Sequence, residues 1–396
     1  MSEKLNQFDK IRAINTFCYL AKIKSPLKDV DEIRHHLLAQ ISLTTGNTKV
    51  DHLGNIFVNI PATPGFENFE CLGLEAHMDT VKVPADKKIS LIDNDTIIKT
   101  DGTTILGADD KAGLTAILET IRIIHEQELT HGPIQLLFTV GEELSMYGVK
   151  GIDYDLVKAK KIICIDGESS EEIYRGCASK IKYQITFIGK EGHGGLPEST
   201  INAILMAIEA VNKMKQYGIF GETNSFGIIK GTTYTENVWH NLSEFNSSDQ
   251  FTSFPATNVV PGKVIVSGEI RGFNNVKMKE ILQIVKTCTE SVVNTASENE
   301  EHLGSVDIKE EIPYTPFIFS EDNEFLLKIQ EAALKAGIKT RSTVTSGATH
   351  ANVFNIHNIP ALVIGAGCRN PHQNTEYLVK EDLYNAIAIL LALTSC

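Results

Sequence analysis

The chain has 396 residues, a formal net charge of −13 and a sequence pI of about 5.4. Its 42% hydrophobic and 22% charged residues are ordinary globular values, which exclude a largely disordered chain, and its length favours two domains. It has no long Lys/Arg run, no apolar stretch of roughly 18 residues, no apolar signal-peptide core and no CxxC pair among its seven cysteines. We therefore expect a cytoplasmic protein with reduced thiols that binds neither nucleic acid nor membranes.

Alternating helices and strands are predicted for the first part of the chain. Helical periodicity covers residues 5–21 and 26–41, a strand–turn–strand pattern covers 50–58, and a helical segment covers 112–124. Short, almost unbroken apolar runs occupy residues 71–74, 134–140, 162–165 and, near the C-terminus, 361–364. Such runs, separated by helices, are typical of strands buried on both faces of a sheet. They predict an α/β domain with a mostly parallel sheet.

The middle of the chain has a different pattern. Residues 180–187 and 263–271 alternate apolar and polar side chains, residues 200–216 and 276–297 are helical in period, and 306–310 could form a closing strand. We predict an α+β domain over residues 178–313, inserted between two parts of the first domain, 1–177 and 314–396. Residues 231–255 are rich in Thr, Ser and Asn, and we expect a long loop or an insertion there.

Metal-ligating side chains follow the apolar runs. In open α/β sheets, ligands bind beyond the carboxyl ends of the strands. Five potential ligands are expected to converge there, two histidines and three carboxylates: His77, Asp109, Glu143, Asp166 and His372. Each has a simpler explanation when taken alone, such as a helix cap or a surface histidine. The prediction rests on their occurrence together at strand ends.

Imidazole and carboxylate ligands suit zinc, and equally cobalt or manganese. Five ligands are too many for one catalytic zinc, but a bridging carboxylate would give each of two zinc ions three. Asp109 is the candidate bridge because it precedes a helix, whose N-terminus favours a carboxylate. Of Glu142 and Glu143, one would bind metal and the other would act as general base on a metal-bound water. Asp79 can hold the imidazole of His77 in the required tautomer.

Several motifs resemble the di-zinc exopeptidase family of peptidase T, aminoacylase and glutamate carboxypeptidase. They are HMDT (77–80), GADDKAG (107–113), GEE (141–143), IDGE (165–168) and the late His372. Within the predicted insert, GKEGHGGLPE (189–198) and TNVVPGKVIVSGEIRG (257–272) resemble the motifs of the family's lid, or dimerisation, domain. The likeness to peptidase T and related tripeptidases is strongest in GADDKAG and in SGATHANVFN (346–355).

The resemblance implies a role for each site residue. One zinc would be bound by His77 and Asp166, the other by Glu143 and His372. Asp109 would bridge them, with a cis peptide bond before Asp110. The catalytic residues would be the general base Glu142, the orienting Asp79, and His193, which would polarise the scissile carbonyl from the partner subunit of a homodimer. Asn258 and Arg271 would hold the terminal carboxylate or a carbonyl of a short peptide substrate.

An aminopeptidase that releases the N-terminal residue of short peptides is the activity that the resemblance implies, because Asp rather than Glu at position 166 is similar to the aminopeptidase branch. The alternative on the same metal site is a deacylase of N-acyl amino acids or another amidohydrolase. A silent binding protein is a further alternative, against which the complete set of ligands and Glu142 argues. One departure is His350, where related sequences usually have Asp; this change could alter specificity or be a neutral loop change.

Overall fold

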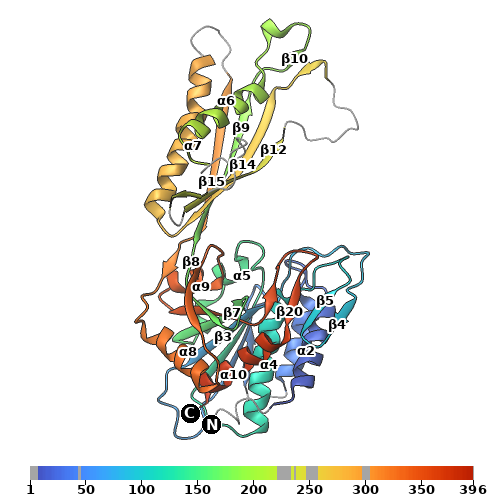
Figure 1. The fold of residues 1–396 in the computed structure, drawn as a ribbon, viewed down its shortest axis with the longest axis vertical. Helices are drawn as coiled ribbons and strands as arrows, with labels where there is room; N and C mark the ends of the chain where they lie inside the picture. The colour runs from blue at the N-terminus through green and yellow to red at the C-terminus, as the bar shows by residue number, and fades with distance from the viewer. Residues whose placement is uncertain are drawn as a thin grey trace. The chain divides into compact units, whose positions relative to one another are not determined.

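The computed structural model describes residues 8–42, 46–220, 233–235, 238–246, 257–296 and 304–395. The chain forms two compact units (Figure 1). Unit 1 consists of Met1–Cys177 and Phe317–Cys396, and unit 2 consists of Ala178–Pro316. In the described residues, no helix combines the length and apolar character that a membrane span requires.

Unit 1 is built on a nine-stranded sheet with the order β1-β2-β6-β3-β7-β18-β8-β16, and β17 also pairs with β8. The central strands β6, β3, β7 and β18 are parallel, whereas the pairs toward both edges are antiparallel except β17 with β8. This arrangement confirms the predicted α/β class. The strands are β1 Asn47–Val50, β2 Ile56–Ile60, β3 Leu72–His77, β6 Ile134–Thr139, β7 Lys161–Gly167, β8 Glu172–Cys177, β16 Phe317–Ile318, β17 Arg341–Thr345 and β18 Ala361–Gly365.

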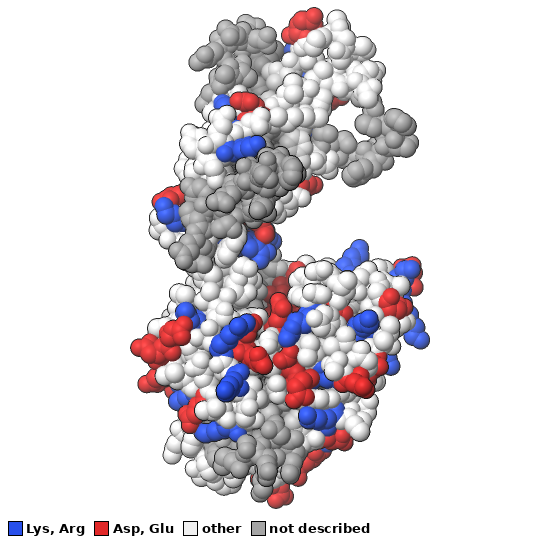
Figure 2. Space-filling model, viewed as in Figure 1, with Lys and Arg blue, Asp and Glu red and all other residues white. Residues whose placement is uncertain are grey.

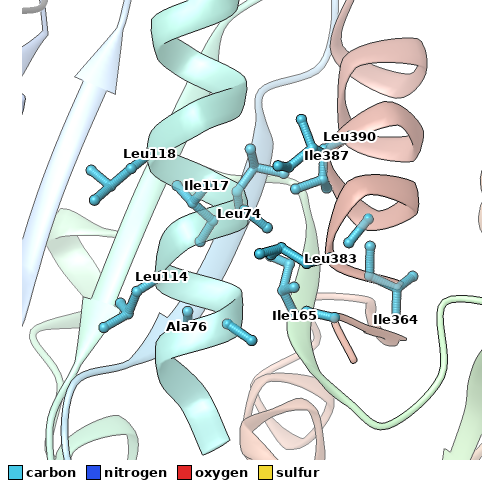
Figure 3. Packing of buried hydrophobic residues seen from close by; sticks show 14 of the residues in the cluster. Leu74, Ala76, Leu114, Ile117, Leu118, Ile165, Ile364, Leu383, Ile387 and Leu390 are labelled. Carbon is cyan, nitrogen blue, oxygen red and sulfur yellow. The ribbon is translucent and has the colours of Figure 1, made fainter. Parts of the chain in front are cut away.

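Helices cover this sheet. Ile117 of one helix and Leu383 and Ile387 of another lie around Leu74 of the sheet (Figure 3). These helices, α4 and α10, therefore lie side by side on one face, and burial of their apolar stripes stabilises the unit. The helices of unit 1 are α2 Lys10–Lys22, α3 Asp31–Ile41, α4 Ala108–Glu126, α5 Tyr147–Lys150, η1 Tyr154–Leu156, α8 Glu324–Lys335, α9 His350–Ile356 and α10 Lys380–Thr394.

A second, four-stranded sheet in unit 1 was not predicted. Its order is β19-β20-β5-β4, with β4 Leu91–Asp93, β5 Ile97–Thr100, β19 Cys368–Arg369 and β20 Tyr377–Val379. These strands are too short to show a clear periodicity in the sequence. The turn between β19 and β20 carries His372, so this small sheet fixes the last of the five candidate ligands in space.

Unit 2 is a five-stranded antiparallel sheet with helices on one face (Figure 1). Ile181 and Ile185 of the sheet are buried in the same cluster as Ala207 and Ile281 of the helices. The elements are β9 Ser179–Ile188, β11 Thr233–Thr235, β12 Val238–Asn246, β14 Lys263–Gly272, β15 Ser305–Tyr314, α6 Ala203–Gln216 and α7 Asn275–Ala296. A separate pair joins β10 Gly192–His193 to β13 Val259–Val260, and η2 covers Pro197–Ser199.

The prediction of a loop over 231–255 is wrong for part of that stretch. Strand β12 lies within it and pairs with β14 along most of its length. Its sequence, VWHNLSEFN, lacks a regular apolar alternation because one of its buried side chains is a histidine, His240. The remaining residues of 231–255, apart from 233–235, lie outside the described part of the chain.

Candidate metal centre

Unit 1 brings all five predicted ligands together. His77 ends β3, Glu143 follows β6 and Asp166 lies in β7, so three neighbouring parallel strands deliver them to one sheet edge. Asp109 lies at the start of α4, where Asp109 and Asp110 have non-helical backbone angles and the peptide bond between them is cis. His372 lies in the turn between β19 and β20, with about half of its side chain exposed.

The imidazole of His77 lies between a backbone anchor and two carboxylates. Its Nδ1 is 2.9 Å from the carbonyl oxygen of Asp79, and its Nε2 is 2.9 Å from Oδ1 of Asp109. Oδ1 of Asp166 is 3.7 Å from the same Nε2. Because a carbonyl oxygen can only accept, the proton belongs on Nδ1, which leaves Nε2 free to bind a cation.

Asp109 faces two different histidines. Its Oδ1 is 2.9 Å from Nε2 of His77, and its Oδ2 is 3.1 Å from Nε2 of His372. Nε2 of His372 is also 2.7 Å from Oε1 of Glu143. A carboxylate with each oxygen directed at a separate imidazole has the geometry of a bridge between two cations.

Asp79 acts on the centre in a way that differs in detail from the prediction. Its carboxylate accepts hydrogen bonds from the backbone N–H groups of Glu142 and Glu143, each at 3.1 Å. Its closer contact with His77 is made by the backbone carbonyl, since Oδ1 lies 3.6 Å from Nδ1. Asp79 thereby ties the end of β3 to the turn that carries the two glutamates.

Asp110 is close enough to His77 and Asp166 to be considered as a ligand. However, its Oδ2 accepts a hydrogen bond from the backbone N–H of His77 at 3.2 Å, and its Oδ1 accepts one from Gly113 at 3.1 Å. Both oxygens of this buried carboxylate are therefore engaged by the backbone, so we assign it to holding β3 and α4 together.

Glu376 was not among the predicted site residues. It is 1% exposed, and its carboxylate accepts hydrogen bonds from backbone N–H groups of the segment that leads to Asp109. No residue pattern could have revealed this contact, because 267 positions separate Glu376 from Asp109. The only available signal was its place four residues after the candidate ligand His372.

His350 was expected near substrate or in a neutral loop, but it is buried at the first position of α9. Its Nδ1 is 2.7 Å from Oε1 of Glu75, a residue of β3 whose carboxylate also accepts a hydrogen bond from Thr139. Its ring lies edge-on to that of His77, with ring centroids 6.1 Å apart. His350 is thus an interior partner of Glu75 beneath the candidate centre.

Burial and mutual repulsion perturb the carboxyl groups of the centre. Burial raises the pKa of Glu142 well above its usual value, and the charges of Asp166 and Glu143 raise it further. Burial also raises the pKa of Asp166 to about 6. The nearby carboxylates of Asp109 and Glu143 raise the pKa of His372 to about 11. Several carboxylates confined in one buried place favour the binding of cations, which would offset their repulsion.

The donor set fits divalent cations. Oε1 of Glu143 is buried and receives no hydrogen bond of ordinary geometry from the described residues, although Nε2 of His372 is near. Ligand atoms of His77, Asp109 and Glu143 lie within 4.8 Å of one another. Figure 2 shows acidic side chains gathered toward the middle of the drawn face of unit 1, where they favour the approach of cations.

The other predicted residues belong to unit 2. His193 is exposed on β10, and its Nδ1 accepts a hydrogen bond from the backbone N–H of Gly195 at 3.0 Å. Asn258 lies beside it, because its carbonyl accepts a hydrogen bond from Gly194 at 2.6 Å. Arg271, near the end of β14, forms an ion pair with Glu269 on the same strand at 2.8 Å. The contacts given above for the candidate centre are made by residues of unit 1.

Comparison with known proteins identifies the family. The model of Peptidase family M20/M25/M40 matches residues 73–395, which include every residue of the centre. The chain belongs to this family. It is an M20 metallopeptidase, a metal-dependent hydrolase, and its likeness to peptidase T extends over the whole fold.

Three known proteins are similar to this chain over almost its whole length. The uncharacterized protein YqjE of Bacillus subtilis is 28% identical over 392 residues, which cover 96% of this chain and 97% of that protein. The crystal structure of the aminopeptidase PepT of Bacillus cereus is similar with a TM-score of 0.81 and 27% identity. That of a tripeptidase of Staphylococcus aureus is similar with a TM-score of 0.84 and 26% identity. Each structural match covers 98% of both chains.

Proposed function

We propose that this M20 metallopeptidase is a di-zinc aminopeptidase that releases the N-terminal residue of short peptides, with tripeptides as the preferred class. The observation that carries the two-metal part is the carboxylate of Asp109, whose two oxygens face His77 and His372 separately. The similarity over the full chain to an aminopeptidase PepT and to a tripeptidase supports the substrate class.

His77 and Asp166 would hold one zinc ion, Glu143 and His372 the other, and Asp109 would bridge them. Cobalt or manganese could replace zinc because the donors are imidazoles and carboxylates. When bound, the two cations would lower the pKa of a shared water and polarise the substrate carbonyl.

Glu142 would act as the general base. Its backbone is held by Asp79, and its pKa is raised by burial, so its carboxylate is suited to accept a proton from the attacking water. The same carboxyl group would then give that proton to the leaving amine. Glu143 differs because its Oε1 is directed at Nε2 of His372, as expected for a ligand.

Residues of unit 2 would bind the substrate. His193 would donate a hydrogen bond to the carbonyl oxygen as negative charge develops there, and in a homodimer it would come from the partner subunit. Its exposure leaves the ring available to a ligand. Asn258 and Arg271 would bind a carbonyl or the terminal carboxylate of the peptide. We also propose a cytoplasmic location, where short peptides released by proteolysis would be the substrates.

A substrate panel tests the activity. Purified protein loaded with zinc would be incubated with di-, tri- and tetrapeptides, with C-terminally blocked peptides and with N-acetyl amino acids, each with and without chelator. Release of the N-terminal residue from tripeptides, abolished by chelator, is the expected result. Cleavage of the N-acetyl amino acids alone would overturn the aminopeptidase assignment and place the protein among deacylases or amidohydrolases with the same centre.

A further inference from the structure

We propose that Glu376 is a positioning residue that joins the segment of the bridging Asp109 to the segment of His372 and so sets the affinity of the centre for metal. This inference rests on the proposed two-metal site. Glu376 would touch neither cation nor substrate, and it would act through the backbone that carries the ligands.

The carboxylate of Glu376 is enclosed by backbone donors. Its Oε2 accepts hydrogen bonds from the N–H groups of Leu106 and Gly107, each at 2.7 Å, and its Oε1 accepts one from Asp109 at 3.1 Å. The Sγ of Cys368 lies 3.6 Å from the same Oε1 and can donate to it. Three backbone N–H groups that converge on one carboxylate form an anion site inside the protein.

The backbone just before α4 has an unusual conformation where it contacts Glu376. Gly107, one of these donors, has a φ of +74°, a left-handed conformation that other residues adopt only with strain. Asp109, two residues later, has its own N–H fixed by the same carboxylate. Glu376 therefore holds the backbone that leads to the bridging residue and the N–H group of that residue itself.

Glu376 itself belongs to the turn that carries His372. Glu376 closes that turn, since its N–H donates to the carbonyl of Gln373 at 2.9 Å, and strand β20 begins at the next residue. A displacement of Glu376 would thus move His372 and Asp109 relative to each other. Their ligand atoms are only 3.1 Å apart, so a small displacement would change the site that both cations share.

Glu376→Gln is the informative variant. An amide has one acceptor oxygen, and its NH2 group would face either the N–H of Asp109 or those of Leu106 and Gly107. At least one of these backbone N–H groups would then have no acceptor. Loss of such supporting contacts typically weakens metal binding by about 10–100-fold. We expect a loss in that range, measured by competition with a chromophoric chelator, together with a changed absorption spectrum of the cobalt-loaded protein.

Glu119→Gln is the matched control. Glu119 is also a fully buried carboxylate of unit 1, but its partners are Arg12, Thr16 and Arg122 in the contact between α2 and α4. This variant should lower the thermal midpoint of unfolding while leaving metal affinity and the cobalt spectrum unchanged. An equal loss of metal affinity in both variants would show a general effect of destabilisation and overturn the proposal.

Two further results separate this inference from the proposed function. A wild-type protein that binds fewer than two cations would overturn the two-metal site itself, whatever the variants do. Wild-type binding of two cations with unchanged affinity in Glu376→Gln would overturn only the role of Glu376. If Glu376→Gln does not fold, Glu376→Asp keeps the charge but is one methylene shorter; it should weaken binding, and full wild-type affinity in it would contradict the inference.

Discussion

Nδ1 of His350 lies 2.7 Å from Oε1 of Glu75, and both side chains are buried in unit 1. Because a buried carboxylate without its partner is costly, His350→Ala should reduce the free energy of unfolding by about 3–5 kcal/mol. Urea unfolding of the full chain measures this loss. The control is His357→Ala, at the residue that follows the same helix: His357 is exposed and its ring stacks on Tyr154, so its loss should cost only about 0.5–1.5 kcal/mol.

A second substitution distinguishes a buried carboxylate left without its partner from a simple cavity. If an unpaired charge causes the loss, changing Glu75 to Gln in the His350→Ala background should recover part of the stability. Additive losses in the double variant would show instead that the two side chains stabilise unit 1 independently.

The central sheet could be predicted because its strands are buried on both faces. The apolar runs near 71–74, 134–140, 162–165 and 361–364 correspond to β3, β6, β7 and β18, which form the parallel centre. The short strands of the β19-β20-β5-β4 sheet escaped prediction, because runs of two to four residues show no clear period. Strand β12 escaped because a buried histidine takes the place of an apolar residue.

The convergence of three candidate ligands could be predicted because His77, Glu143 and Asp166 lie at or near the ends of neighbouring parallel strands, which end at a common edge. The contacts that support them could not. Glu376 reaches Asp109 across 267 positions, and the partner of His350 lies on β3, 275 positions away. Such pairs depend on tertiary packing, for which a single sequence carries no local pattern.

Asp109→Ala should remove both cations, because the two oxygens of this carboxylate face the histidines of both proposed sites. Asp166→Ala should weaken one site and leave the other, since His77 is the only one of the two histidines that lies near Asp166. Metal content after dialysis against a weak chelator measures the difference. Retention of one full equivalent of zinc by Asp109→Ala would contradict the bridging role.

Glu142→Ala should abolish turnover while two zinc ions remain bound. The removal of a general base typically lowers the rate by about 10²–10⁴-fold. Metal analysis and peptide hydrolysis of the same preparation provide the test. If metal is lost together with activity, the roles of Glu142 and Glu143 are the reverse of those proposed.

His193→Ala should keep its metal and lose about 10²–10³-fold in kcat, the usual effect of removing one donor to a developing oxyanion. If His193 acts across a dimer, mixing inactive His193→Ala with inactive Glu142→Ala should restore activity after subunit exchange. Each mixed dimer then has one centre with both groups. Unchanged turnover in His193→Ala would remove this residue from the mechanism, and failure of mixing to restore activity would place it in the same subunit.

We expect His240 to make the stability of unit 2 dependent on pH. Its Nε2 is 2.6 Å from the hydroxyl of Tyr183, its Nδ1 is 3.1 Å from the carbonyl of Ile219, and burial lowers its pKa to about 4. An unfolded histidine has a pKa of about 6.5, so between these values the unfolded chain binds more protons and stability falls as the pH falls. From pH 7 to 4.5 the loss from this residue should be about 2 kcal/mol.

The fluorescence of Trp239, the single tryptophan of the chain and the neighbour of His240 on β12, follows the unfolding of this unit in urea. His240→Gln can still accept a hydrogen bond from Tyr183, but it does not titrate. The difference in unfolding free energy between wild type and His240→Gln should therefore shift by about 2 kcal/mol in favour of the variant as the pH falls from 7 to 4.5. A difference that stays constant with pH would show that His240 protonates equally in the folded and unfolded chain, and that the pH dependence of unit 2 comes from other groups.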